Sequence, residues 1–271
     1  MNDAHRLAGY VEVWWAAVQD FLTLLDQVPG EEWATPTDLP GWTVHDVVAH
    51  TAHLEAVLAG APEETLQIEP GPHVTGLMGL YTEQGVAARR DRTPDQLIEE
   101  IRRSALVRHE ALLRDPPSDA SARPERIFGG VPWTWDTLLR NRPLDVWMHE
   151  QDVRRAVGRP GNLDSPAARH TTDYLAGSLP LVVAKRAGAL PGSTVVLRVV
   201  GSDPVAVGVG EDGRGRLLPE APAAPTVTLE MDRETFVVLA GGRRAASERD
   251  VAITGDAELA ARVLAGMAVT P

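Results

Sequence analysis

The sequence predicts an α+β protein in which an N-terminal bundle of helices is followed by a smaller domain of strands and short helices. Helix-period apolar patterns fill the first half, whereas short β-rich runs separated by turn signals begin near Gly192. With 271 residues, 44% of them hydrophobic, the chain is long enough for two cores. We expect domains at 1–162 and 163–271, with the boundary somewhere within 162–190.

Caps and apolar spacing predict the helices of the first half. Apolar side chains recur at nearly 3.6 residues from His5 to Val28, and "QVPGEEWATPTDLPGWT" then interrupts the pattern with prolines and glycines. Thr43 is a natural N-cap with Asp46 in the capping-box position, so a helix should follow as far as Leu58. Further helices are expected over 74–90, 94–113 and 134–157. The loop at 115–133, rich in Pro, Gly and Ser, is a candidate to line a site.

The second half changes its pattern after one more helix, expected over 166–187. The β-rich runs are "STVVLRVVG", "DPVAVGVG" and "PTVTLEMD", with a turn signal at Glu211-Asp212-Gly213. Short helices in "RETFVVLAGG" and "DAELAARVLAGM" flank a further strand, "DVAITG". This alternation predicts a small α+β domain.

Composition narrows the range of partners. The formal charge of −12 argues against nucleic acid and anionic membranes, which need a basic surface. The apolar runs are too short to cross a bilayer and the N-terminal residues do not form a signal peptide, so we expect a cytoplasmic protein, either a monomer or a homodimer.

Because the chain has no cysteine, any sulfur chemistry must arrive with a cofactor. Lys185 is the one lysine among 26 basic residues, which is typical of a GC-rich, actinobacterial genome.

Helical spacing brings together residues that can bind a divalent metal ion. His50 lies on the apolar stripe of its helix, while Asp145 and His149 are four residues apart on another. Two imidazoles and one carboxylate leave a coordination position open, which is typical of a catalytic zinc site. Spacing alone leaves alternatives: the acid and His149 could be a surface pair, and His50 a hydrogen-bonded core histidine. His53, expected at the edge of the stripe, is the alternative ligand.

Other polar residues near these helices are weaker candidates. Asp152 can approach His149 on the same helix face and accept its second ring proton, or it can serve packing alone. Arg142 could hold a carboxylate of a substrate, or form a structural salt bridge. His73, His109 and His170 are expected at the surface, and Trp133 or Trp135 at a pocket rim or in the core.

Three segments carry a resemblance to a known family. "LPGWTVHDVVAHTAHLE" (39–55) and "LDVWMHEQDVRRAVGRPGN" (144–162) resemble motifs of the mycothiol-dependent maleylpyruvate isomerase family, which belongs to the DinB-like metalloenzymes. "DVAITGDAELAARVLAGM" (250–267) is similar to the end of the sterol-carrier-protein-like domain appended to those bundles. The resemblance implies a DinB-like four-helix bundle with His50, Asp145 and His149 as metal ligands, although the family's acidic ligand is usually glutamate.

The resemblance also implies an activity. Zinc is the expected metal, and mycothiol the expected thiol cosubstrate, which would coordinate the metal as a thiolate and attack a small electrophile. Release of the adduct would make the protein an S-transferase; rotation and elimination would make it an isomerase. An arginine of the second domain, Arg243 or Arg244, could polarise a substrate carboxylate. The rival hypotheses are a metal-dependent hydrolase and a non-catalytic protein that binds a metal or a small ligand.

Overall fold

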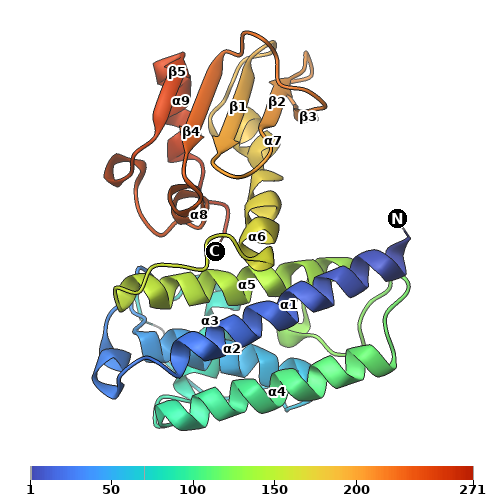
Figure 1. Cartoon of the computed structure of the whole chain (residues 1–271), viewed down its shortest axis with the longest axis vertical. Helices are drawn as coiled ribbons and strands as arrows, with labels where there is room; N and C mark the ends of the chain where they lie inside the picture. Colours follow the sequence, from blue (N-terminus) through green and yellow to red (C-terminus); the bar gives the residue numbers. More distant parts are fainter. Residues whose placement is uncertain (1, 70, 271) are drawn as a thin grey trace. The chain divides into compact units, whose positions relative to one another are not determined.

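The structure, a computed structural model shown in Figure 1, describes residues 2–69 and 71–270, apart from the side chain of Glu248. It divides into two compact units, Met1–Asn162 and Leu163–Pro271. Each unit is described by itself below.

The first unit is a bundle of four long helices. Helix α1 packs against α4 and α5, α2 also packs against α4 and α5, and the shorter α3 lies against α2 (Figure 1). The helices are α1 (Asp3–Leu25), α2 (Val44–Leu58), α3 (Gly76–Ala87), α4 (Pro94–Arg114) and α5 (Trp135–Ala156), with 3-10 turns η1 (Gly30–Ala34) and η2 (Phe128–Gly130). The predicted helical bundle is therefore confirmed.

The sequence signals for helix starts act in the structure as predicted. Thr43 accepts a hydrogen bond from the backbone N–H of Asp46, whose side chain accepts one from the backbone of Thr43 in return. Thr93 and Gln96 form a second capping box, with Pro94 at the first position of α4. These bonds satisfy N–H groups that the first turn of a helix cannot pair internally.

Helix α2 is the central element of the bundle. Every residue in it is buried except His45, because α3, α4 and α5 all pack against it. The one-sided apolar stripe expected from spacing was therefore too narrow, and His53 is fully buried rather than at an edge. Polar side chains on this helix must find partners inside the protein, since an unpaired buried polar group costs about 1–3 kcal/mol.

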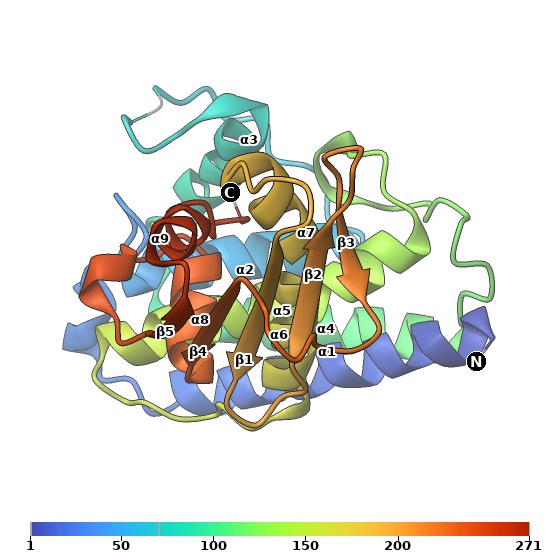
Figure 2. The same cartoon turned by 90° about the horizontal axis from the view of Figure 1, so that it is seen from above.

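The second unit is a five-stranded sheet covered by helices, seen from above in Figure 2. Its strand order is β3-β2-β1-β4-β5, with β1 and β4 parallel and the other neighbours antiparallel. The strands are β1 (Thr194–Val199), β2 (Val205–Val209), β3 (Gly215–Leu218), β4 (Val227–Met231) and β5 (Ala252–Gly255). The helices are α6 (Pro166–Ala176), α7 (Leu179–Leu181), a π-helical turn (Val182–Arg186), α8 (Arg233–Ala240) and α9 (Ala257–Ala265), with a 3-10 turn at Ala246–Glu248.

Two details of this unit differ from the prediction. The single helix expected over 166–187 is interrupted after Ala176, where Gly177 and Ser178 separate α6 from α7. Pro180 contributes to the break because it has no N–H to continue the helical bonding. The edge strand β3 was not predicted, since "GRLL" is four residues long and lacks an alternating pattern.

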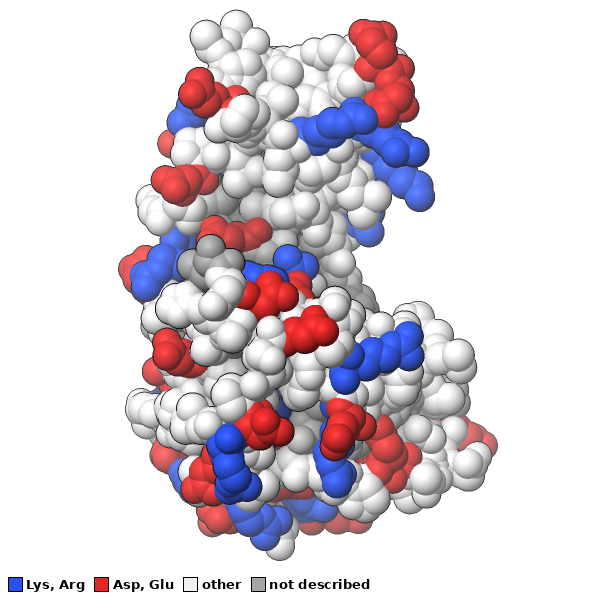
Figure 3. Space-filling view, turned by 90° about the vertical axis from the view of Figure 1, so that its right-hand side faces the viewer, with Lys and Arg blue, Asp and Glu red and all other residues white. Residues whose placement is uncertain are grey.

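Two surface observations bear on the expected partners. In the described part of the chain, no helix combines the length and the apolar character that crossing a membrane requires. On the face shown in Figure 3, acidic and basic side chains are interspersed, and no continuous basic patch covers it.

Candidate metal centre

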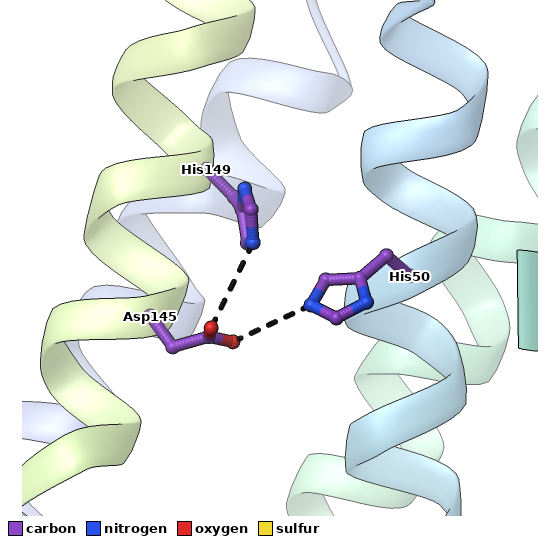
Figure 4. Close-up of side chains that lie close together, drawn as sticks. All are labelled: His50, Asp145 and His149. Atoms are coloured by element: carbon purple, nitrogen blue, oxygen red, sulfur yellow. Dashed lines mark ion pairs between the residues drawn. The ribbon is translucent and has the colours of Figure 1, made fainter. Parts of the chain in front are cut away.

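Three potential ligands from two helices converge inside the first unit, as Figure 4 shows. Asp145 and His149 come from successive turns of α5, and His50 faces them from α2. The Nε2 atom of His50 lies 3.9 Å from Oδ2 of Asp145, and Nε2 of His149 lies 3.7 Å from Oδ1. Within the described residues this is the one group of three or more such side chains placed to share an ion.

The spacing of these atoms fits a small divalent cation. One ligand atom from each residue lies within 4.8 Å of the others. Tetrahedral zinc with bonds of about 2.1 Å needs ligand atoms about 3.4 Å apart. A modest inward movement of these three side chains would bring their ligand atoms to that spacing. A cation bound at this point would also lie between the imidazole lone pairs and the carboxylate oxygens, which face each other in its absence. The residues present therefore fit a zinc-like ion with three protein ligands, and a tetrahedral shell would leave one position for an exchangeable ligand.

The protonation states suit ligation. Burial lowers the pKa of His50, and this favours the neutral imidazole that can bind a metal. Burial alone would raise the pKa of Asp145, but Arg142 and the two imidazoles outweigh it and hold the pKa far below its usual range. At neutral pH the group thus offers a neutral nitrogen from His50 and an anionic oxygen from Asp145.

Asp152 contacts His149 on the side away from the other ligands. Its Oδ2 lies 3.2 Å from Nδ1 of His149, and its Oδ1 accepts a bond of 2.5 Å from Arg155. Arg155 also donates to Asp38, in the loop before α2, at 2.8 Å. A carboxylate at Nδ1 fixes the tautomer that leaves the Nε2 lone pair facing Asp145.

Trp42 borders the same group, and the sequence analysis did not single it out. Its ring centroid lies 5.2 Å from that of His50 and 6.4 Å from that of His149. The indole N–H donates to the buried Glu83 at 3.0 Å. The available signal was the position of this tryptophan beside the predicted N-cap Thr43.

His73, expected as an isolated surface residue, packs into this region instead. Its Nε2 lies 3.4 Å from Glu83 Oε2, the oxygen that also accepts from Trp42. The ring lies so close to Gly41 and Gly71 that a Cβ at either glycine would come within 3.0 Å of it. Gly41 has φ of +80°, so a side chain there would be strained as well as crowded.

Arg142 lies behind Asp145, fully buried. It donates to Asp145 at 2.8 Å and to Glu55 on α2 at 2.7 and 3.2 Å. Glu55, which is also fully buried, was not recognised in the sequence. A glutamate within the apolar run of a predicted helix was the signal that could have revealed it.

His53, the alternative ligand, lies outside the group. Its ring is 5.2 Å from that of Tyr81, its Nδ1 lies 3.4 Å from Arg89, and a Cβ at Gly85 would overlap it. Its buried Nε2 has no hydrogen-bond partner among the described residues. Burial, reinforced by the charge of Arg89, lowers the pKa of His53 to about 3.

The low pKa of His53 predicts acid sensitivity. Below about pH 6.5 the unfolded chain binds a proton that the folded chain refuses, so stability falls as the pH drops. Between pH 7 and 5 the loss should reach about 2 kcal/mol, because the slope approaches about 1.4 kcal/mol per pH unit below the unfolded pKa. Denaturant unfolding of metal-free protein at pH 7 and 5 measures it. The His53→Gln variant should lose about 2 kcal/mol less over this interval; an equal loss in both proteins would refute the assignment.

The two candidate arginines of the second unit differ in their surroundings. Arg243 is half-buried and donates to the carbonyl of Gly241 at 2.7 Å and to the hydroxyl of Thr270 at 3.4 Å. Arg244 is exposed and borders a hollow of about 600 Å³ together with Leu239, Ile253 and Leu264.

Comparison with known proteins gives both sequence and structural matches. The curated relatives include uncharacterized proteins from two strains of Mycobacterium tuberculosis, each 25% identical over 166 residues. The match covers 59% of this chain, and the chain spans 63% of the length of those relatives.

Two solved structures have the same fold. One is the mycothiol-dependent maleylpyruvate isomerase, with a TM-score of 0.55, and the other is a histidine-to-alanine variant of it, with a TM-score of 0.53. Each is 20% identical, and each match covers 94% of this chain and 96% of the other. The profile of the mycothiol maleylpyruvate isomerase N-terminal domain matches residues 14–154, and that of the family's C-terminal domain matches 169–262. The chain belongs to the mycothiol-dependent maleylpyruvate isomerase family.

Proposed function

We propose that this protein is a metal-dependent enzyme that uses a low-molecular-weight thiol, mycothiol, to isomerise a small electrophilic molecule or to transfer the thiol to it. The observation that carries the proposal is the convergence of His50, Asp145 and His149 on one point inside the bundle. Family membership supports the thiol dependence, since the matching profile bears the name of mycothiol. A cytoplasmic location in an actinobacterium, where such a thiol would be available, belongs to the same proposal.

The three residues would hold a divalent ion, with zinc the first choice for two imidazoles and a carboxylate. When bound, the ion would lower the pKa of a coordinated thiol toward neutrality, as it does for water. This supplies the nucleophile that a chain without cysteine lacks. Nickel or iron could occupy the same ligands.

The surrounding residues have distinct roles in this proposal. Asp152 would keep the Nε2 atom of His149 unprotonated through its contact with Nδ1. Trp42 would shield the imidazoles from bulk water, held in place by Glu83. Arg243 and Arg244 remain candidates to bind a substrate carboxylate, and the exposed Arg244 is the better placed for contact with a solute.

Metal content provides the first test. Purified wild-type protein should contain about one equivalent of a divalent metal by elemental analysis. The His149→Ala variant should contain none, because it lacks one of the three protein ligands. Isothermal titration of the metal-loaded wild type with mycothiol should then give a binding signal that the variant lacks. His109→Ala is the matched control: His109 stacks on Trp15, outside the group, and its variant should retain the metal. Metal-free wild type that takes up no added zinc would contradict the proposal and favour a non-catalytic binding protein.

A further inference from the structure

Arg142 connects a candidate metal ligand, the partly exposed Asp145, to the fully buried carboxylate of Glu55. One terminal nitrogen donates to Oδ2 of Asp145 at 2.8 Å. The other terminal nitrogen and Nε donate to Oε1 of Glu55, at 2.7 and 3.2 Å. The guanidinium therefore spans two carboxylates from two helices, α2 and α5, which a planar fork of donors can do and a single ammonium cannot.

The burial of Arg142 rules it out as a substrate anchor. The side chain is 0% exposed, and all three of its nitrogens are engaged with Glu55 or Asp145. A substrate carboxylate could reach it only by displacing one of these partners. The residue therefore acts through Asp145, not on a bound molecule.

Glu55 is fixed independently from two further helices. Trp14 on α1 donates its indole N–H to Oε1 at 3.1 Å, and Arg108 on α4 approaches Oε2 at 3.4 Å. The Arg108 guanidinium also lies over the Trp14 ring, 4.6 Å from its centroid. Four helices therefore meet at this carboxylate, and of these partners of Glu55 it is Arg142 that also donates to Asp145.

We infer that Arg142 is a positioning residue that orients the Asp145 carboxylate for metal binding. This inference rests on the proposed function. Arg142 holds Oδ2, which lies 3.9 Å from Nε2 of His50, while Oδ1 lies on the side of His149, 3.7 Å from its Nε2. Asp145 would otherwise have to lose rotational freedom when it binds the ion. Polar partners of metal ligands typically contribute 10- to 100-fold in metal affinity.

A competing effect makes the inference testable. If Arg142 merely competed with the ion for the lone pairs and charge of Asp145, removing it would tighten metal binding. If it positions the carboxylate, removing it weakens binding. The two roles therefore predict changes of opposite sign in the affinity for the metal ion when Arg142 is removed.

The experiment compares zinc affinities, by competition with a chromophoric chelator, of the full-length wild type, Arg142→Met, Arg142→Lys and Arg108→Met. Arg108 is the matched control, since it is another buried arginine that pairs with Glu55 but has no bond to Asp145. Circular dichroism and thermal unfolding of the metal-free proteins report folding. Arg142→Lys keeps the positive charge, and its zinc affinity tests the inference if Arg142→Met does not fold.

We expect Arg142→Met to bind zinc about 10- to 100-fold more weakly, Arg142→Lys to be weakened to a smaller degree, and Arg108→Met to stay within about threefold of wild type. Both methionine variants should be less stable, so stability loss alone does not produce this pattern. Unchanged or tighter binding by folded Arg142 variants, or an equal loss in Arg108→Met, would overturn the inference while leaving the metal site intact. Wild type that binds no zinc would instead overturn the proposed function, and this inference with it.

Discussion

Glu55→Ala is expected to lower the free energy of unfolding by about 3–5 kcal/mol, the loss typical when one partner of a buried ion pair is removed. The substitution would leave Arg142 and Arg108 buried without their shared carboxylate, and the Trp14 N–H without its acceptor. Burial already lowers the pKa of Arg108 to about 10 with Glu55 present, so its charge depends on this partner. Denaturant unfolding monitored by tryptophan fluorescence measures the change.

A matched variant separates this network from a general effect of removing a glutamate. Glu99 is also helical, but its side chain is 63% exposed and pairs with Arg102, three residues further along α4. Glu99→Ala should change the unfolding free energy by less than about 0.5 kcal/mol. If Glu55→Ala proved equally mild, the buried network would not stabilise the bundle as described.

His50→Ala is expected to reduce thiol-dependent turnover by about 1000-fold or more in kcat/KM, equivalent to about 4 kcal/mol of transition-state stabilisation. Two of the three ligands would remain, both on α5, and two ligands hold a catalytic ion poorly. Mycothiol with maleylpyruvate tests isomerisation, and mycothiol with chlorodinitrobenzene tests S-transfer.

The control for this prediction lies on the same helix. His45 faces away from the ligand group, with its Nε2 2.8 Å from the carbonyl of Arg92. His45→Gln retains a polar group there and should keep kcat/KM within a few fold of wild type. A His50→Ala protein that kept both its rate and its dependence on added thiol would refute the role assigned to the site.

Most of the successful predictions depended on residues that lie close together in the sequence. Thr43 with Asp46, and Thr93 followed by Pro94, identified helix starts because capping depends on residues a few positions apart. The separation of Asp145 and His149 identified one half of the candidate site for the same reason. The choice of His50 over His53 came from helix phase together with the family motif, and the structure places His50 in the group.

Interactions between distant segments account for what the sequence analysis missed. Glu55 is informative only once Arg142 and Arg108 are seen around it, at separations of 87 and 53 residues. Trp42 likewise matters through its contact with His149, on a helix far along the chain. The complete burial of His53 depends on the number of helices packed around α2, which apolar spacing within one segment does not encode.

The distance along the chain between the ligands has a thermodynamic consequence. His50 and Asp145 are separated by 95 residues, so an unfolded chain would retain at most the weak chelate of Asp145 and His149. An ion that binds the native state selectively adds about 2.7 kcal/mol of stability at a hundredfold excess over its dissociation constant. Metal supply would then affect how much of the protein survives proteolysis in the cell, and a chelator used in purification would lower the stability of the protein as well as its turnover.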